Sequence, residues 1–131
     1  MTHKNLNRFV AIGVFLVTLV VYLRTLSCTV VFWDVGEFIA ASKLMQVPHP
    51  PGSPLFLYWA RIAMMIPFAA DQAVRAHAFS ALCSALGIMF TYLVIVRVIL
   101  GFRGMPENLH DRVVAYGAGA IGAWYTPERF F

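Results

Sequence analysis

The sequence predicts an all-α protein, a polytopic membrane helical bundle, from its composition and from two long uncharged runs. Hydrophobic residues make up 60% of the 131 residues and charged residues only 12%, whereas an ordinary soluble domain carries about 25% charged residues. Residues 9–23 and 76–96 contain no Asp, Glu, Lys or Arg, and a helix needs about 20 predominantly apolar residues to cross a bilayer. We therefore expect one transmembrane domain over residues 1–131, with spans at about 9–26 and 76–96.

The first span follows Lys4 and Arg8, and a basic start before a short apolar run is also typical of a signal peptide. Arg24 lies where a cleavage region would be small and neutral, so we interpret the segment as a retained anchor. In the second span, small residues recur at near-helical spacing and predict a face that packs on other helices. They are Ala76, Ser80, Ser84 and Gly87.

A third apolar run, residues 55–70, is interrupted by Arg61 and Pro67. Each uninterrupted piece is short, so we expect a helix that lies at the membrane interface or re-enters it. Residues 27–75 then form an outer loop with interfacial helices. This topology puts the basic residues that flank the two spans on one side, in agreement with the positive-inside rule. They are Lys4, Arg8, Arg97, Arg103 and Arg112.

Residues 113–125 begin a further apolar segment of about 13 residues, which is too short to span. We expect an incomplete third span, and we interpret the chain as an N-terminal fragment of a longer polytopic protein. Residues 117–122 match G-x-G-x-x-G, but a dinucleotide fold needs a following helix and an acidic residue about 20 positions later. Only residues 123–131 follow, so the glycines are better explained by close helix packing.

Charge and cysteine content exclude other classes of protein. The net charge of +4 is scattered, with no basic run and no aromatic–basic interleaving, so no nucleic-acid partner is expected. Cys28 and Cys83 lie in very different segments without metal-ligand spacing, which predicts neither a disulfide nor a metal site.

Asp34 and Glu37 lie three residues apart, directly after Trp33. On a helix these two positions share a face, so both carboxylates can point at one substrate. The spacing equally fits a capping box, with Asp34 as N-cap of a helix that continues through residues 38–41. Trp33 suits either interpretation, because tryptophan prefers the membrane interface.

Residues 47–54 read V-P-H-P-P-G-S-P and cannot be helical, because proline fixes φ and pushes the preceding residue into extended geometry. We expect a stiff loop, with the next helix beginning near Pro54. The loop is either a helix-to-helix connector or a rigid wall that holds His49 against the acid pair, and composition leaves both open.

Arg61 and Arg75 lie in the same predicted outer loop. A guanidinium in an apolar setting usually contacts a carboxylate or a phosphate. Ion pairs with Glu37 or Asp71, or snorkelling to lipid headgroups, are the structural alternatives to a substrate contact.

Three segments together resemble the start of a family of large polytopic membrane proteins. They read F-W-D-V-G-E-F-I-A-A, V-P-H-P-P-G-S-P-L-F and R-A-H-A-F-S-A-L. Over about residues 8–100 the chain is similar to the family of domain of unknown function 2723, which includes the transmembrane protein 260 type of protein O-mannosyltransferase. W-D-x-G-E followed by H-P-P-G-x-P at this separation is a specific combination.

The resemblance implies a GT-C-type glycosyltransferase, a multi-span helical bundle that moves a sugar, here mannose, from a polyprenyl-phosphate donor to a protein hydroxyl or other acceptor, such as a glycan. We expect it in the bacterial inner membrane, with the site loop on the non-cytoplasmic side and no cofactor. Carried onto this sequence, Asp34 is the catalytic acidic residue and Glu37 its neighbour. Two carboxylates alone are a poor divalent-ion site, so no metal is predicted. The expected substrate-binding residues are His49, Arg61, Arg75 and Trp33.

A non-catalytic membrane module, or part of a transporter, is the competing class. It explains the apolarity, the small residues and a capping box equally well. Only the resemblance and the gathering of Asp34, Glu37, His49 and Arg61 in one loop favour the enzyme. As a fragment, the chain is expected to be inactive alone.

Overall fold

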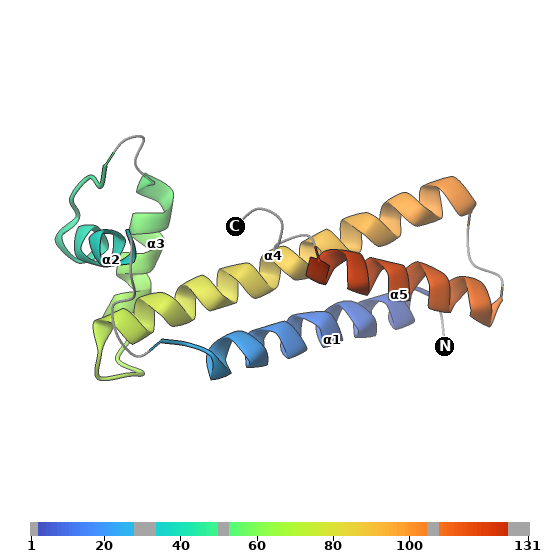
Figure 1. Ribbon diagram of the computed structural model, residues 1–131, viewed down its shortest axis with the longest axis horizontal. Helices are drawn as coiled ribbons and strands as arrows, with labels where there is room; N and C mark the ends of the chain where they lie inside the picture. The colour runs from blue at the N-terminus through green and yellow to red at the C-terminus, as the bar shows by residue number, and fades with distance from the viewer. Residues whose placement is uncertain (1–2, 28–33, 50–52, 105–107, 126–131) are drawn as a thin grey trace. The chain divides into compact units, whose positions relative to one another are not determined.

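The computed structural model describes residues 3–27, 34–49, 53–104 and 108–125, and these form five α-helices and no strand (Figure 1). The helices are α1 (His3–Arg24), α2 (Val35–Leu44), α3 (Pro54–Met65), α4 (Gln72–Arg103) and α5 (Leu109–Tyr125). The all-α prediction is therefore confirmed for this part of the chain, and the polytopic bundle stays a prediction.

The chain divides into two compact units. The bundle unit comprises Met1–Val21 and Ser84–Phe131, and the loop unit comprises Tyr22–Cys83. The bundle unit holds most of α1, most of α4 and all of α5. The loop unit holds α2, α3 and the first turns of α4, and the predicted site residues all fall in it.

Two of the helices, α1 and α4, are long and apolar enough to cross a membrane. The 22 residues of α1 extend about 33 Å and the 32 residues of α4 about 48 Å, against a hydrocarbon core of about 30 Å. The helix α1 begins before the predicted span 9–26 and ends two residues short of it, whereas α4 extends beyond the predicted span 76–96 at both ends. The 17 residues of α5 include the G-x-G-x-x-G segment, which is therefore helical throughout and not a phosphate-binding turn.

Packing in the bundle unit depends on the close approach of α5 to α4 and on two partly buried hydrogen bonds. Tyr92 is fully buried, and its hydroxyl donates to Asn7 Oδ1 at 2.9 Å. Trp124 Nε1 donates to Thr18 Oγ1 at 2.8 Å, which ties α5 to α1. Gly119 allows α5 to approach α4 closely, because a Cβ at this position would lie 2.6 Å from a methyl group of Val96.

Within the described residues, the small-residue face predicted for α4 is not the face that is buried, and its packing on other helices stays a prediction. Ala76 is buried, but Ser80, Ser84 and Gly87 are exposed. The buried positions instead follow a neighbouring stripe that includes Ile88 and large residues such as Tyr92. The stripe gains more apolar contact from these side chains than from serine and glycine. It consists of Ala81, Ala85, Ile88, Tyr92 and Val96.

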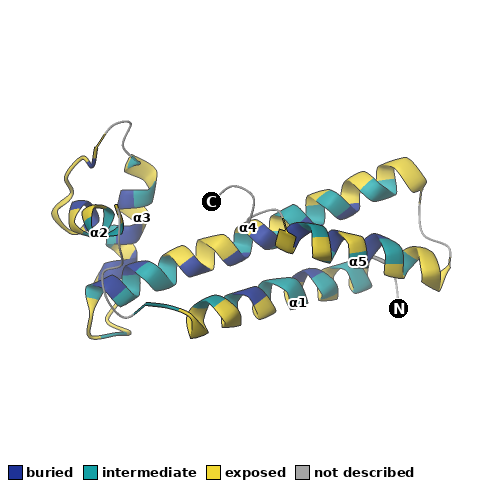
Figure 2. Ribbon diagram, in the orientation of Figure 1, coloured by how far each residue is buried: buried dark blue, intermediate teal, exposed yellow. Residues whose placement is uncertain are grey.

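Figure 2 shows exposed residues along α1, and many of them are large and hydrophobic. Phe9, Ile12, Leu16 and Val20 are each at least half exposed. In water such a continuous face would be a liability, whereas lipid chains solvate it without cost. This exposure agrees with a helix that lies in a bilayer.

The loop unit is held together by aromatic and main-chain contacts between its helices. Phe38 of α2 meets Phe56 of α3 edge to face, with ring centroids 6.0 Å apart, and Phe56 lies against Phe79 of α4 at the same distance. Arg61 Nη1 donates to the Lys43 carbonyl near the end of α2, at 2.9 Å. These contacts fix α2 against α3.

Arg75, in the first turn of α4, holds the turn that joins α3 to α4. Its Nε donates to Ala69 O at 2.7 Å, and its Nη1 donates to Met64 O at 2.8 Å. Asp71 Oδ1 accepts from the Ala73 N–H at 2.8 Å, which satisfies one of the free N–H groups at the start of α4. The last turn of α3 is thus bonded directly to the first turn of α4.

The predicted start of a helix near Pro54 is confirmed. Pro54 is the first residue of α3, as expected for a residue whose missing N–H is not needed there, and the helix stops before Pro67. At 12 residues, or about 18 Å, α3 is too short to cross a bilayer.

Candidate active site

The backbone of α2 brings Asp34, Glu37 and His49 to one place. Asp34 directly precedes α2, and Glu37 lies in its first turn. At the other end of the helix, Met45 adopts a left-handed conformation with φ 54°, and the Gln46 N–H donates to Ala41 O at 3.0 Å. This turn reverses the chain, so that residues 46–49 lead back beside α2.

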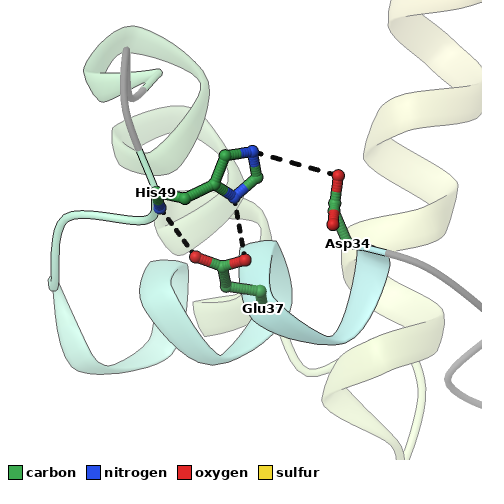
Figure 3. A network of polar contacts seen from close by, with 3 residues as sticks. All are labelled: Asp34, Glu37 and His49. Carbon is green, nitrogen blue, oxygen red and sulfur yellow. Dashed lines mark hydrogen bonds and ion pairs between the residues drawn. The ribbon is translucent and has the colours of Figure 1, made fainter.

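His49 makes two close contacts with Glu37 and one longer contact with Asp34 (Figure 3). The backbone N–H of His49 donates to Glu37 Oε1 at 2.7 Å. The ring Nδ1 lies 2.9 Å from Glu37 Oε2, and the ring Nε2 lies 3.9 Å from Asp34 Oδ2. The proline-rich loop therefore does hold His49 against the acid pair, which is one of the two interpretations that the sequence left open.

The capping-box interpretation of the acid pair is wrong. Asp34 makes no side-chain capping hydrogen bond, although its carbonyl accepts from the Phe38 N–H at 3.0 Å. The Glu37 carboxylate, which a capping box would turn back towards residue 34, instead binds His49 with both oxygens. A stronger partner for Glu37, a histidine ring with its own N–H, competes with the cap and leaves the Asp34 carboxylate open.

Charge and hydrogen bonding shift the pKa values of Glu37 and His49 in opposite directions. The side-chain hydrogen bond from His49, then its backbone N–H, lowers the pKa of Glu37 below 4.5. The hydrogen bond to Glu37, followed by the charges of Glu37 and Asp34, raises the pKa of His49 above 6.5. Both groups are therefore charged in the pH window between the two pKa values. Glu37 loses its charge as pH falls through its lowered pKa, and His49 loses its charge as pH rises through its raised pKa.

The same three side chains have the donor types of a metal site. Asp34, Glu37 and His49 can each offer one atom, and these atoms lie within 4.8 Å of one another. Carboxylate oxygen and imidazole nitrogen are usual ligands of Zn²⁺ and related ions. Two carboxylates alone are a poor divalent-ion site, but His49 lies beside them as a third possible donor. The Glu37–His49 hydrogen bonds satisfy most of these atoms without an ion.

The two arginines bind main-chain carbonyls. Arg61 contacts Lys43 O, and about 9 Å of helix rise separates Lys43 from Glu37. Arg75 contacts Met64 O and Ala69 O. In the described part of the chain neither guanidinium forms an ion pair with Glu37 or Asp71. Trp33 lies outside the described residues.

Two features of the site went unnoticed in the sequence. Phe38 contacts the His49 ring edge to face, with centroids 6.0 Å apart. Its position directly after Glu37 in the sequence could have indicated that it lies close to the acid pair. The left-handed Met45 carries no such signal, because a non-glycine residue seldom adopts positive φ.

The fold and the site define an α-helical membrane protein with an exposed carboxylate–histidine cluster in its loop unit. Two helices suited to crossing a membrane lie on either side of this cluster in the sequence. The chain belongs to the family described as the protein O-mannosyl-transferase TMEM260 N-terminal domain, whose model matches residues 34–127. The match confirms the resemblance and supports a glycosyltransferase-like role. No curated protein and no solved structure matches the chain significantly.

Proposed function

We propose that this domain serves a membrane glycosyltransferase that moves mannose from a polyprenyl-phosphate donor to a protein hydroxyl, with Asp34 as the general base. The observation that supports this role is the open Asp34 carboxylate. It is half exposed and makes no capping bond, and it lies beside a histidine that Glu37 holds in place.

The chemistry needs little beyond a base and a cation. The acceptor oxygen attacks the anomeric carbon of the sugar, and the bond from that carbon to the phosphate oxygen breaks. The lipid phosphate leaves with the electron pair and needs no proton to do so. The hydroxyl proton passes to the Asp34 carboxylate, which must lie within hydrogen-bond reach of the acceptor.

In this proposal Arg61 neutralises the donor phosphate. Its guanidinium donates one hydrogen bond to Lys43 O and has five N–H groups in total, so further donors are available for phosphate. Arg75 uses two nitrogens on the turn between α3 and α4 and is the second candidate for this contact. Trp33, which precedes Asp34, would contact the donor or the interface.

The direct test of the function is sugar transfer. Membranes that contain the protein should move radiolabel from polyprenyl-phosphate mannose to a serine- or threonine-containing peptide, and membranes without it should not. Transfer that is equal in both preparations would contradict the proposal.

The proposal also includes a topology, with the loop unit on the non-cytoplasmic side of a bacterial inner membrane. In a variant without Cys28 and Cys83, a cysteine placed at Gln46 or Gln72 should react with a membrane-impermeant maleimide in intact cells. The positive-inside rule predicts this orientation, because Lys4 and Arg8 lie in the first turns of α1 and Arg97 and Arg103 lie in the last turns of α4. A cysteine at Asn108 is the matched control and should react only after permeabilisation. Reaction at Gln46 and Gln72 only after permeabilisation would contradict this topology.

The exposed side of α3 supports an interfacial helix. One stripe at helical spacing is uncharged and exposed, and it includes Tyr58 and Trp59, residue types that prefer the membrane interface. The stripe consists of Leu55, Tyr58, Trp59, Ile62 and Met65. The single charged residue of α3, Arg61, instead contacts α2.

Trp59 fluorescence tests this placement. With Trp33 and Trp124 replaced by Phe, lipids brominated near the headgroup should quench Trp59 more strongly than lipids brominated near the chain end, because an interfacial helix lies about 5–10 Å into the boundary region. Quenching by neither lipid would mean that the stripe does not lie in the membrane.

A further inference from the structure

The gap between Asp34 and His49 has the size and polarity of a hydroxyl site. The 3.9 Å between Asp34 Oδ2 and His49 Nε2 is longer than a hydrogen bond, which joins such atoms at about 2.7–3.2 Å. Because Glu37 occupies Nδ1, Nε2 is the nitrogen left to contact a ligand, and Figure 3 shows it directed towards Asp34.

We propose that the acceptor hydroxyl binds in this gap, with His49 Nε2–H donating to its oxygen and its own hydrogen directed at Asp34 Oδ2. This inference rests on the proposed function and deepens it by assigning the acceptor subsite. An oxygen atom about 2.8 Å from both atoms fits across the gap. The hydroxyl is then oriented with its proton on the base before it attacks.

The arrangement selects for the chemical class of the acceptor. A hydroxyl both accepts and donates a hydrogen bond, so it satisfies both atoms. A protonated amine has no acceptor lone pair for the Nε2–H group. A carboxylate acceptor would repel Asp34. The subsite therefore suits serine and threonine side chains or a sugar hydroxyl.

Glu37 acts in this proposal as a positioning residue and not as a catalytic residue. Its two oxygens bind the backbone N–H and the ring Nδ1 of the same histidine, which fixes both the loop and the ring. The Glu37 carboxylate holds the proton on Nδ1 and orients the ring, and Nε2 carries the hydrogen that it donates in the protonated form of His49, in which both ring nitrogens are donors. Phe38 limits ring rotation from one side. Among the described residues, the charged groups that contact His49 are Glu37 and Asp34, both at the start of α2.

Steady-state kinetics with varied peptide acceptor provides the test. His49→Leu removes the Nε2–H donor and should raise the acceptor KM about 10- to 100-fold, the usual effect of losing a hydrogen bond to a charged group, while the donor KM stays unchanged. His49→Gln restores a donor amide and should recover part of this loss. Glu37→Gln should raise the acceptor KM less than His49→Leu does. The acceptor KM should rise at alkaline pH as His49 loses its Nε2 proton, and Glu37→Gln should move this rise to lower pH, because the hydrogen bond to the Glu37 carboxylate and its charge raise the pKa of His49. His110→Leu, at an exposed histidine in α5, is the matched control.

An equilibrium measurement separates this inference from the proposed function. The Asp34→Asn protein cannot use the base, but its amide oxygen still accepts from a hydroxyl. It should bind a serine peptide more tightly than the matching alanine peptide, and adding His49→Leu should reduce the difference, because only the contact with the amide oxygen then remains. Equal binding of the two peptides, or a His49→Leu effect on donor KM alone, would overturn the subsite even if transfer itself is observed. A chelator that matches the His49→Leu effect would assign the three side chains to a metal ion instead.

Discussion

Asp34→Asn is expected to abolish sugar transfer while the protein still folds and inserts normally. Loss of a general base typically lowers a rate by about 10²–10⁴-fold. Asparagine keeps the size of the side chain but cannot take the acceptor proton. Because Asp34 makes no side-chain capping hydrogen bond, its replacement removes no structural contact of that kind.

Asp34→Ala is likewise expected to lose sugar transfer without loss of stability. A capping role would make Ala cost about 1 kcal/mol of stability and leave Asn harmless. Without the capping bond, both variants should keep their thermal stability and both should lose transfer. Asp111→Asn, at an exposed acid in the first turn of α5, should retain full activity as the matched control. An active Asp34→Asn protein would end the catalytic assignment and make Glu37 the next candidate.

Gly119→Ala is expected to destabilise the bundle unit, whereas Gly117→Ala in the same helix should be neutral or stabilising. A Cβ at Gly119 would lie 2.6 Å from Val96 Cγ2 and 3.2 Å from the Tyr92 ring. Valine has one strongly preferred rotamer in a helix, so the methyl group cannot turn away easily. Overpacking of this kind typically costs about 1–3 kcal/mol.

Gly117 isolates the packing effect from helix propensity. A Cβ at Gly117 meets nothing within 4 Å, and both substitutions gain the same intrinsic preference of about 1 kcal/mol for alanine over glycine. Because this gain cancels in the comparison, the difference in melting temperature between the two variants in mild detergent should report the packing cost at Gly119 alone. Equal melting temperatures would mean that α5 does not approach α4 as described.

The elements that the sequence predicted well are those set by strong local rules. Proline at position 54 marks the start of α3 because its lost N–H matters least there, and uninterrupted apolar runs mark α1 and α4. The meeting of His49 with the acid pair was predicted only as one of two alternatives. Its outcome depends on the left-handed turn at Met45, and no local pattern encodes that turn.

The errors came from competition between partners, which spacing alone does not reveal. The spacing of Asp34 and Glu37 satisfies the capping-box rule. The rule takes no account of His49, 12 residues further along the chain, which binds the Glu37 carboxylate instead. The face of α4 that is buried within the described residues also differs from the small-residue face. Small residues permit close approach, but the surface that is buried also depends on where the large residues such as Tyr92 lie.

The Arg75 contacts have a mechanical consequence for a protein in a bilayer. A helix as long as α4 adapts to a thinner membrane by tilting. Because Arg75 bonds the first turn of α4 to Met64 at the end of α3, a movement of that turn displaces α3 as well. The ring contacts of Phe38 with Phe56 and with His49 extend this connection to the acceptor subsite. Within the loop unit, the start of the long helix and the His49 ring are thus joined by a continuous series of contacts.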